Sequence, residues 1–174
     1  AGDELWLLGP LGIGFTAPAG ERRALLAGGG VGVPPLAAGA RELAAQGIAA
    51  GALLGFRDAH HAEGARLLAA APVRVATDDG SVGHHGLVTD LLAAALDEDA
   101  AATVYACGPP AMLEAVRALC AARGVPAQLA LEAGMACGFG ACYGCVVPVR
   151  DGAYVRLCVD GPVLDAAALD GVPA

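Results

Sequence analysis

The sequence predicts an α/β fold in which a doubly wound, five-stranded parallel sheet is followed by a small cysteine-rich subdomain. Short apolar runs alternate with helix-like stretches from about residue 22 to residue 131, which is the rhythm of strands joined through helices. A glycine-rich turn joins the first apolar run to the first helix-like stretch. After Glu132 the rhythm stops, and glycines and four closely spaced cysteines take over.

Five apolar runs are the expected strands, and the stretches between them are the expected helices. The strands are predicted over residues 23–27, 49–56, 73–76, 103–106 and 127–131, and the helices over residues 34–45, 60–70, 87–96 and 110–123. Parallel strands connected in this way form a sheet that helices cover on both faces. Beyond it, residues 145–149 and 153–157 flank an Asp151-Gly152 pair, which predicts a β-hairpin. We therefore expect a nucleotide-binding domain over residues 21–132, a cysteine-rich subdomain over 133–168 and a tail over 169–174.

Composition excludes two classes of function. The net charge is −8 with only ten Lys and Arg residues, whereas a nucleic-acid-binding surface needs clustered basic side chains. No apolar run approaches the roughly 20 residues that a membrane-spanning helix needs. A chain of 174 residues with 56% apolar residues can bury one core of ordinary size. We expect a cytoplasmic protein that has neither a nucleic-acid partner nor a membrane span.

Four of the six cysteines form the most specific pattern in the chain. Cys137, Cys142 and Cys145 have the spacing Cys-x4-Cys-x2-Cys, which is the plant-type [2Fe-2S] signature, and Cys158 follows the predicted hairpin. A loop that wraps a cluster must aim its thiolates and its backbone N–H groups inward, and the interspersed glycines permit such turns. The predicted metal ligands are therefore Cys137, Cys142, Cys145 and Cys158.

Structural zinc is the alternative for this loop. Zinc sites usually show two Cys-x2-Cys pairs, whereas this region has one. The other two cysteines stand apart from it. Cys120 lies inside a predicted helix as a small apolar residue, and Cys107 ends the fourth predicted strand, at the edge of the sheet where such folds bind ligands.

Three turns are expected to meet at that edge and form a nucleotide site. The first contains Gly28, Gly29, Gly30 and Gly32 and leads to Pro35, where glycines let backbone amides approach a pyrophosphate. The alternative is a glycine turn that only packs. In the second turn, Asp78, Asp79 and Gly80 either bind ribose hydroxyls and amides or form a solvated turn; the third turn begins at Cys107.

Two pairs of adjacent histidines are better explained as surface residues than as metal ligands. His60-His61 and His84-His85 cannot share one face of a helix or strand, and no carboxylate spacing supports a site. Arg57 and Asp58, at the end of the second predicted strand, favour NADP and NAD respectively, so these residues leave the choice of dinucleotide open.

Taken together, these motifs resemble the ferredoxin-NADP reductase superfamily, and within it the electron-transfer subunits of NAD-dependent dihydroorotate dehydrogenases. The resemblance covers almost the whole chain. Its most specific segments are the cysteine loop and Cys158-Val159-Asp160-Gly161-Pro162-Val163. It also rests on Gly9-Pro10-Leu11-Gly12-Ile13-Gly14-Phe15 and on Cys107-Gly108-Pro109-Pro110-Ala111-Met112.

The resemblance implies an oxidoreductase subunit with three cofactors: NAD, FAD and a [2Fe-2S] cluster. It places Gly108, Pro109 and Met112 at the nucleotide and Cys107 near the nicotinamide. Residues 1–20 resemble the junction that follows an N-terminal flavin barrel, which is missing here, so FAD is expected of the intact family member. The implied partner is the FMN-binding catalytic subunit, which oxidises dihydroorotate to orotate in pyrimidine biosynthesis, in a heterotetramer. Val163, Leu164 and Phe139 are candidate partner-facing residues.

Two other functions fit parts of the same pattern. The flavin and iron-sulfur subunits of an NADPH:ferredoxin oxidoreductase or a sulfhydrogenase share most of these motifs. The alternative from another functional class is a nucleotide-binding module that a structural zinc ion holds together and that has no redox role.

Overall fold

The computed structural model describes residues 2, 4–20, 22–68 and 71–173. Its centre is one sheet with the strand order β4-β3-β2-β1-β5-β6-β9. The five predicted parallel strands are present, with bounds close to those expected: β1 Arg23–Gly29, β2 Ala50–Phe56, β3 Val73–Thr77, β5 Ala102–Cys107 and β6 Ala127–Ala130. The doubly wound fold class is therefore confirmed.

Besides the five predicted strands, the sheet contains two very short strands that were not predicted. They extend the sheet at its two edges. β4 His84–His85 adds in parallel to β3, and β9 Val163–Asp165 pairs antiparallel with β6. A two-residue, exposed histidine strand has no apolar pattern to detect. β9 belongs to the segment beyond the cysteine loop, so that segment completes the main sheet.

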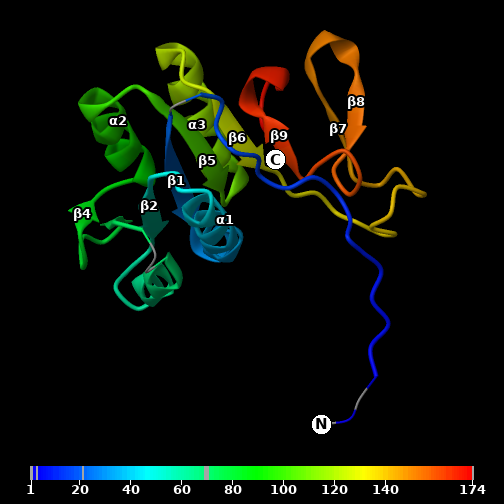
Figure 1. The fold of residues 1–174 in the computed structure, drawn as a ribbon, viewed down its shortest axis with the longest axis horizontal. Coiled ribbons are helices and arrows are strands. Elements are labelled where there is room, and N and C mark those ends of the chain that lie inside the picture. The colour runs from blue at the N-terminus through cyan, green and yellow to red at the C-terminus, as the bar shows by residue number, and fades with distance from the viewer. Residues whose placement is uncertain (1, 3, 21, 69–70, 174) are drawn as a thin grey trace.

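Helices cover both faces of the sheet, as Figure 1 shows. They are α1 Val33–Ala45, α2 Val88–Glu98 and α3 Pro110–Arg123. The helix-like stretch predicted over 60–70 is present as a 3-10 helix over His61–Leu68 (η2), and residues 69–70 lie outside the described residues. Within η2, only Leu68 is buried, so this stretch lacks the apolar face that would hold a longer α-helix against the sheet.

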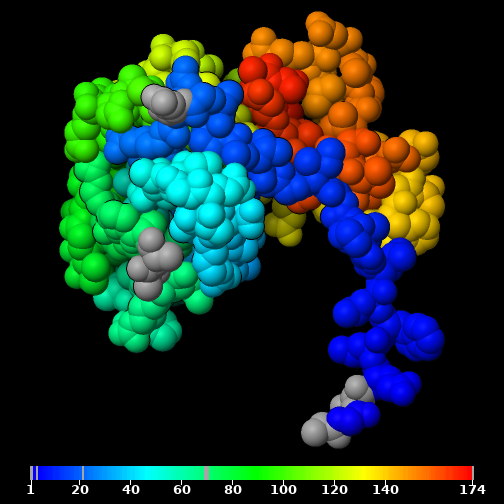
Figure 2. All heavy atoms as spheres, in the orientation of Figure 1, coloured from blue at the N-terminus to red at the C-terminus, as the bar shows by residue number. Residues whose placement is uncertain are grey.

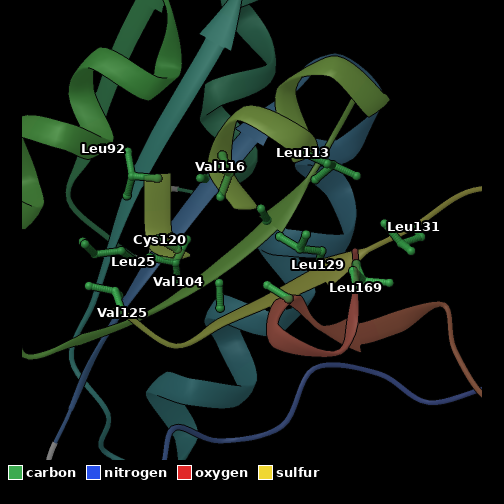
Figure 3. Close-up of a cluster of buried hydrophobic side chains, with 14 of the residues drawn as sticks. Leu25, Leu92, Val104, Leu113, Val116, Cys120, Val125, Leu129, Leu131 and Leu169 are labelled. Carbon is green, nitrogen blue, oxygen red and sulfur yellow. The ribbon is translucent and has the colours of Figure 1, made fainter. Parts of the chain in front are cut away.

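Two apolar cores lie on opposite faces of the sheet. One joins α1 and η2 to residues of β1, β2 and β5. The other, drawn in Figure 3, contains Leu92 of α2, Val116 and Cys120 of α3, and the buried residues Leu129 and Leu169. This second core also takes in Cys145, Val147, Leu157 and Cys158, so the cysteine-rich region packs into the core of the sheet domain.

The predicted hairpin is present beside the sheet. β7 Val146–Pro148 and β8 Tyr154–Arg156 pair antiparallel around Asp151 and Gly152, both of which have a positive φ (65° and 72°). Figure 1 shows the hairpin and the cysteine loop on the side of the molecule away from β4. The chain end packs as well, since the Val172 N–H donates to Glu114 of α3 (2.9 Å).

The N-terminal segment has two parts. Residues 4–9 extend away from the body of the molecule in Figure 2, and Leu5, Trp6, Leu7 and Leu8 are largely exposed. Ile13 then bridges to Pro162, and Thr16 accepts a hydrogen bond from the Tyr105 hydroxyl (2.9 Å). In the described part of the chain, no helix has the length and apolar character needed to cross a bilayer.

Candidate functional site

The cysteine loop, residues 137–145, brings its thiols together in pairs. Cys145 and Cys158 are buried, and their sulfurs lie 3.2 Å apart across the base of the hairpin. At the other end of the loop, the Cys142 N–H donates to Cys137 Sγ (3.4 Å). Cys142 is exposed and Cys137 is partly exposed. Cys145 and Cys158 belong to the apolar core, whereas Cys137 and Cys142 lie on the outer part of the loop.

Backbone N–H groups point at the sulfurs, as a thiolate cluster requires. The amides of Phe139 and Cys142 lower the pKa of Cys137 to about 6. The Cys158 N–H, directed at Cys145 Sγ (3.5 Å), lowers the pKa of Cys145, whereas the neighbouring Cys145 sulfur raises the pKa of Cys158. Amides that stabilise negative sulfur also stabilise a bound iron–sulfur cluster.

The pairing of the thiols suits two metal atoms better than one. A [2Fe-2S] cluster takes two cysteines on each iron, whereas structural zinc needs one tetrahedral set of four. The donor chemistry of the loop therefore fits a two-iron cluster.

A first cleft of about 870 Å³ opens at the carboxyl edge of β1 and β5. Its lining includes Gly30, Pro35 and Cys107, together with Glu132 and Met135, which precede the cysteine loop in the chain. The cleft is therefore lined both by the predicted nucleotide turn and by the segment that leads to the cysteine loop.

Gly30 and Gly32 have different roles in this turn. Gly30 is exposed at the cleft with φ +53°, and a Cβ there would meet no other atom within 4 Å. Gly32 is buried, and a Cβ there would collide with the Cys107 carbonyl. Gly32 therefore allows α1 to begin directly against the end of β5, and Gly30 presents bare backbone to the cleft.

Cys107 lies in the first cleft, where the sequence placed it. Burial, with a smaller contribution from Glu132, raises the pKa of its thiol. The side chain is therefore a neutral thiol at neutral pH, which can pack or donate a weak hydrogen bond but is a poor nucleophile.

A second cleft of about 550 Å³ adjoins the first and shares Gly29, Gly30 and Pro109 with it. It extends over the ends of β2 and β3. Its polar rim is formed by Arg57, His61, Asp78 and Thr89, and Met112 lies at its base. Together the two clefts form a continuous depression along the edge of the sheet, which suits an elongated ligand such as a dinucleotide.

Some predicted site residues line neither cleft. Gly28 is buried in β1, where a Cβ would lie 2.6 Å from Leu36 Cδ1. The Asp79 carboxylate turns back to accept hydrogen bonds from the N–H and hydroxyl of Ser81 (2.9 and 2.6 Å), and Gly80 lies in the same turn. In this structure Gly28 packs, and Asp79 and Gly80 build the turn that carries Asp78.

The remaining predicted residues lie at or beside the clefts. Gly29, Gly32, Pro35 and Gly108 line the first cleft, and Asp78 and Met112 line the second. Asp58 does not line the clefts, because its carboxylate accepts hydrogen bonds from the backbone N–H of His61 (2.9 Å) and contacts its ring (2.8 Å). His84 and His85 are exposed, as expected of surface residues.

Sequence reasoning missed two kinds of site residue. Phe15 lines the first cleft, and its ring packs edge-on against Tyr105 (5.6 Å between centroids). The two residues are 90 positions apart, so no local sequence pattern predicts this contact. Phe15 was noted only as the end of a motif, and Glu132 and Met135 were not predicted as cleft residues. Of the candidate partner-facing residues, Phe139 is exposed, whereas Val163 and Leu164 are partly buried in β9.

Comparisons with known proteins agree with this geometry. Residues 132–170 match the family model described as the iron-sulfur cluster binding domain of dihydroorotate dehydrogenase B. The chain is 47% identical over 173 residues to the dihydroorotate dehydrogenase B (NAD(+)) electron transfer subunit of Geobacillus thermodenitrificans, covering 95% of this chain. It is 43% identical over 171 residues to the same subunit of Listeria monocytogenes, again covering 95% of this chain.

The chain is a homologue of the dihydroorotate dehydrogenase B electron transfer subunits. It spans 65% of the length of these relatives. A solved structure of an NADH-dependent reduced ferredoxin-NADP oxidoreductase, described in work on flavin-based electron bifurcation, superimposes with a TM-score of 0.77 at 31% identity. That match covers 94% of this chain and 59% of the other. The ferredoxin-NADP reductase type of fold is thereby shown for this chain.

Proposed function

We propose that this chain is the electron-transfer part of an NAD-dependent dihydroorotate dehydrogenase. In this proposal, Cys137, Cys142, Cys145 and Cys158 hold a [2Fe-2S] cluster, and the clefts bind NAD together with the flavin ring of FAD. The carrying observation is that one cleft is lined both by Gly30 and Cys107 and by Glu132 and Met135, which lead into the cysteine loop. In this proposal the nicotinamide site therefore lies next to the segment that carries the cluster ligands.

Each wall of the clefts has a task in this proposal. The open backbone at Gly30 and the start of α1 receive the pyrophosphate, because the positive end of the helix dipole favours negative charge there and Gly30 has no side chain to block the approach. Asp78 and Arg57 meet the adenosine ribose in the second cleft. Cys107, Gly108 and Pro109 pack against the nicotinamide in the first.

The cofactors divide the redox chemistry between them: bound nicotinamide exchanges an electron pair as hydride, the cluster exchanges single electrons, and a flavin between them supplies the conversion. The chain's own residues supply the geometry. Four thiols with inward-facing amides fix the cluster, and the apolar walls of the first cleft keep the reacting rings dry.

The partner in this proposal is the FMN-binding catalytic subunit that oxidises dihydroorotate to orotate in pyrimidine biosynthesis. The curated relatives are named as electron transfer subunits, a name that implies a catalytic companion. We place the assembly in the cytoplasm as a heterotetramer, and the exposed Phe139, beside Cys137, is a candidate contact with the catalytic subunit.

The proposal is tested by mixing the cluster-loaded chain anaerobically with the FMN-binding catalytic subunit of the same organism. Dihydroorotate should then reduce the cluster, which is followed by loss of its visible absorption and by the appearance of an electron paramagnetic resonance signal. A cluster that stays oxidised with dihydroorotate and is reduced through ferredoxin would instead support a ferredoxin-NADP oxidoreductase subunit, the second candidate, which the solved structure at TM-score 0.77 favours.

A further inference from the structure

Arg156 connects the β7–β8 hairpin to the cysteine loop. It is the last residue of β8, and its Nη1 donates to the Gly140 carbonyl at 3.3 Å. Its guanidinium carbon lies 5.3 Å from the centre of the Tyr143 ring. Gly140 stands between Cys137 and Cys142, and Tyr143 stands between Cys142 and Cys145. One side chain therefore contacts both halves of the loop.

The guanidinium is held in place from its own strand. Asp160 Oδ2 accepts hydrogen bonds from the Arg156 backbone N–H (2.9 Å) and from its Nε (3.4 Å). The Asp160 N–H in turn donates to the Arg156 carbonyl (2.8 Å). Because this short turn fixes the start of the side chain, the Nη1 end is directed at the loop.

The loop is shaped to accept the arginine. Gly140 is buried with φ +89°, and a Cβ there would lie 2.7 Å from Val159 Cγ2 and 3.3 Å from Arg156 Nη1. Tyr143 has a φ of +57°, a left-handed conformation that is unfavourable for a residue with a side chain. The contact between the cation and the aromatic ring stabilises the loop in this conformation.

The peptide group that Arg156 contacts lies between two predicted cluster ligands, Cys137 and Cys142. Its carbonyl belongs to Gly140, and its N–H belongs to Ala141, the residue before Cys142. A hydrogen bond to the carbonyl of a peptide strengthens the donor at its other end. The positive charge on Arg156 is thus passed, through one peptide, toward a predicted cluster ligand.

We propose that Arg156 is a positioning residue that fixes the cysteine loop on the hairpin and stabilises the reduced state of the cluster. The inference rests on the proposed cluster site and adds a residue to it. The reduced cluster carries one more negative charge than the oxidised one, so a nearby positive charge and polarised amides favour reduction. Without Arg156, the midpoint potential falls.

The test compares Arg156→Gln with Arg66→Gln in the whole chain. Both substitutions remove one positive charge, but Arg66 is on η2, has a side chain 80% exposed, and pairs with Glu63. Arg156→Lys keeps the positive charge but loses the planar guanidinium group and its fixed set of hydrogen-bond donors. The midpoint potential of the reconstituted cluster is measured for each variant. Hydrogen exchange of residues 138–145 is measured separately on the metal-free chain.

We expect Arg156→Gln to have a lower potential than Arg66→Gln, and about threefold to tenfold faster exchange in residues 138–145, which corresponds to the loss of one ordinary hydrogen bond. Arg156→Lys should regain most of the potential but not the protection from exchange. Equal potentials and equal exchange in the two glutamine variants would overturn the proposal.

The exchange measurement separates this inference from the proposed function. If the unsubstituted chain takes up no iron, the proposed cluster fails, yet exchange in residues 138–145 still reports whether Arg156 holds the loop. If only Arg156→Gln fails to take up iron, faster exchange there supports the positioning role and unchanged exchange refutes it.

Discussion

The sulfurs of Cys145 and Cys158 lie 3.2 Å apart although the β7–β8 hairpin separates them in the chain. The hairpin closes this pair because Leu157 N–H donates to the Cys145 carbonyl (3.1 Å), directly beside the thiols. Both cysteines are buried in the core shared with the sheet. The cluster loop is therefore anchored at one end by the fold itself.

Cys142→Ala should abolish cluster assembly and leave the fold intact. Cys142 is exposed and lies outside the two apolar cores, so its truncation removes a ligand without removing buried surface. Iron content and visible absorption should be lost on reconstitution, whereas far-ultraviolet circular dichroism should match the unsubstituted chain.

Cys120→Ala is the matched control. Cys120 is 1% exposed within α3, far along the chain from the loop, so its truncation should cost about 1 kcal/mol of stability and retain the full iron content. Loss of iron in the Cys120 variant, or retention of iron in the Cys142 variant, would show that the ligands are assigned incorrectly.

Gly32→Ala should destabilise the sheet domain by about 2 kcal/mol, because the added Cβ collides with the Cys107 carbonyl, which is backbone and cannot swing away. Urea unfolding measures the change. Gly39→Ala adds the same atom inside α1, where it would lie 3.6 Å from Phe15 Cδ2. That variant should be about 0.5 to 1 kcal/mol more stable; equal effects of the two substitutions would contradict the role given to Gly32.

The Glu114 carboxylate should make the docking of the chain end dependent on pH. Its hydrogen bonds with Arg117, and the donation from Val172 N–H, lower the pKa of Glu114 from 4.5 to about 2. Because the pKa is lower in the folded state, the stabilisation is fully present above about pH 4.5 and is lost as pH falls toward 2. Glu114→Gln should therefore be less stable than the unsubstituted metal-free chain at pH 6, and the difference should shrink as the pH is lowered. A constant difference from pH 6 to pH 3 would exclude this linkage.

Arg57→Ala should weaken binding of NADPH by about tenfold or more and change binding of NADH by less than about threefold. Arg57 lines the second cleft, where its guanidinium would contact the 2′-phosphate of NADPH, whereas the Asp58 carboxylate is hydrogen-bonded to His61. Isothermal titration with each dinucleotide measures both affinities. Unchanged affinities for both dinucleotides would place the adenosine ribose elsewhere.

The parts of the fold that were predictable from sequence have strong local signals. The five parallel strands are apolar runs bounded by turns, and α3 was predicted at its observed bounds because Pro110 and Gly124 punctuate it. The Asp151-Gly152 hairpin was found for the same reason. η2 was predicted only as a helix-like stretch, and its 3-10 conformation goes with a single buried residue, Leu68, among those that the structure describes.

The site could be predicted only where the spacing of residues in the sequence specifies its chemistry. The four cysteines follow from their intervals, but the role of Gly32 against Cys107 and that of Phe15 against Tyr105 depend on contacts between distant residues. Asp79 illustrates the same limit, since its sequence context allows a ligand contact and its hydrogen bonds to Ser81 use the carboxylate locally. Arg156 had no signal, because its importance comes from the loop that folds against it.

The central claim is tested most directly by quantifying iron, zinc and acid-labile sulfide after oxygen-free reconstitution of the whole chain. The four thiols and the amides around them predict a brown protein with about two irons and about two sulfides per chain. A colourless protein that holds one zinc and releases no sulfide on acidification would contradict the cluster, and with it the proposed electron transfer.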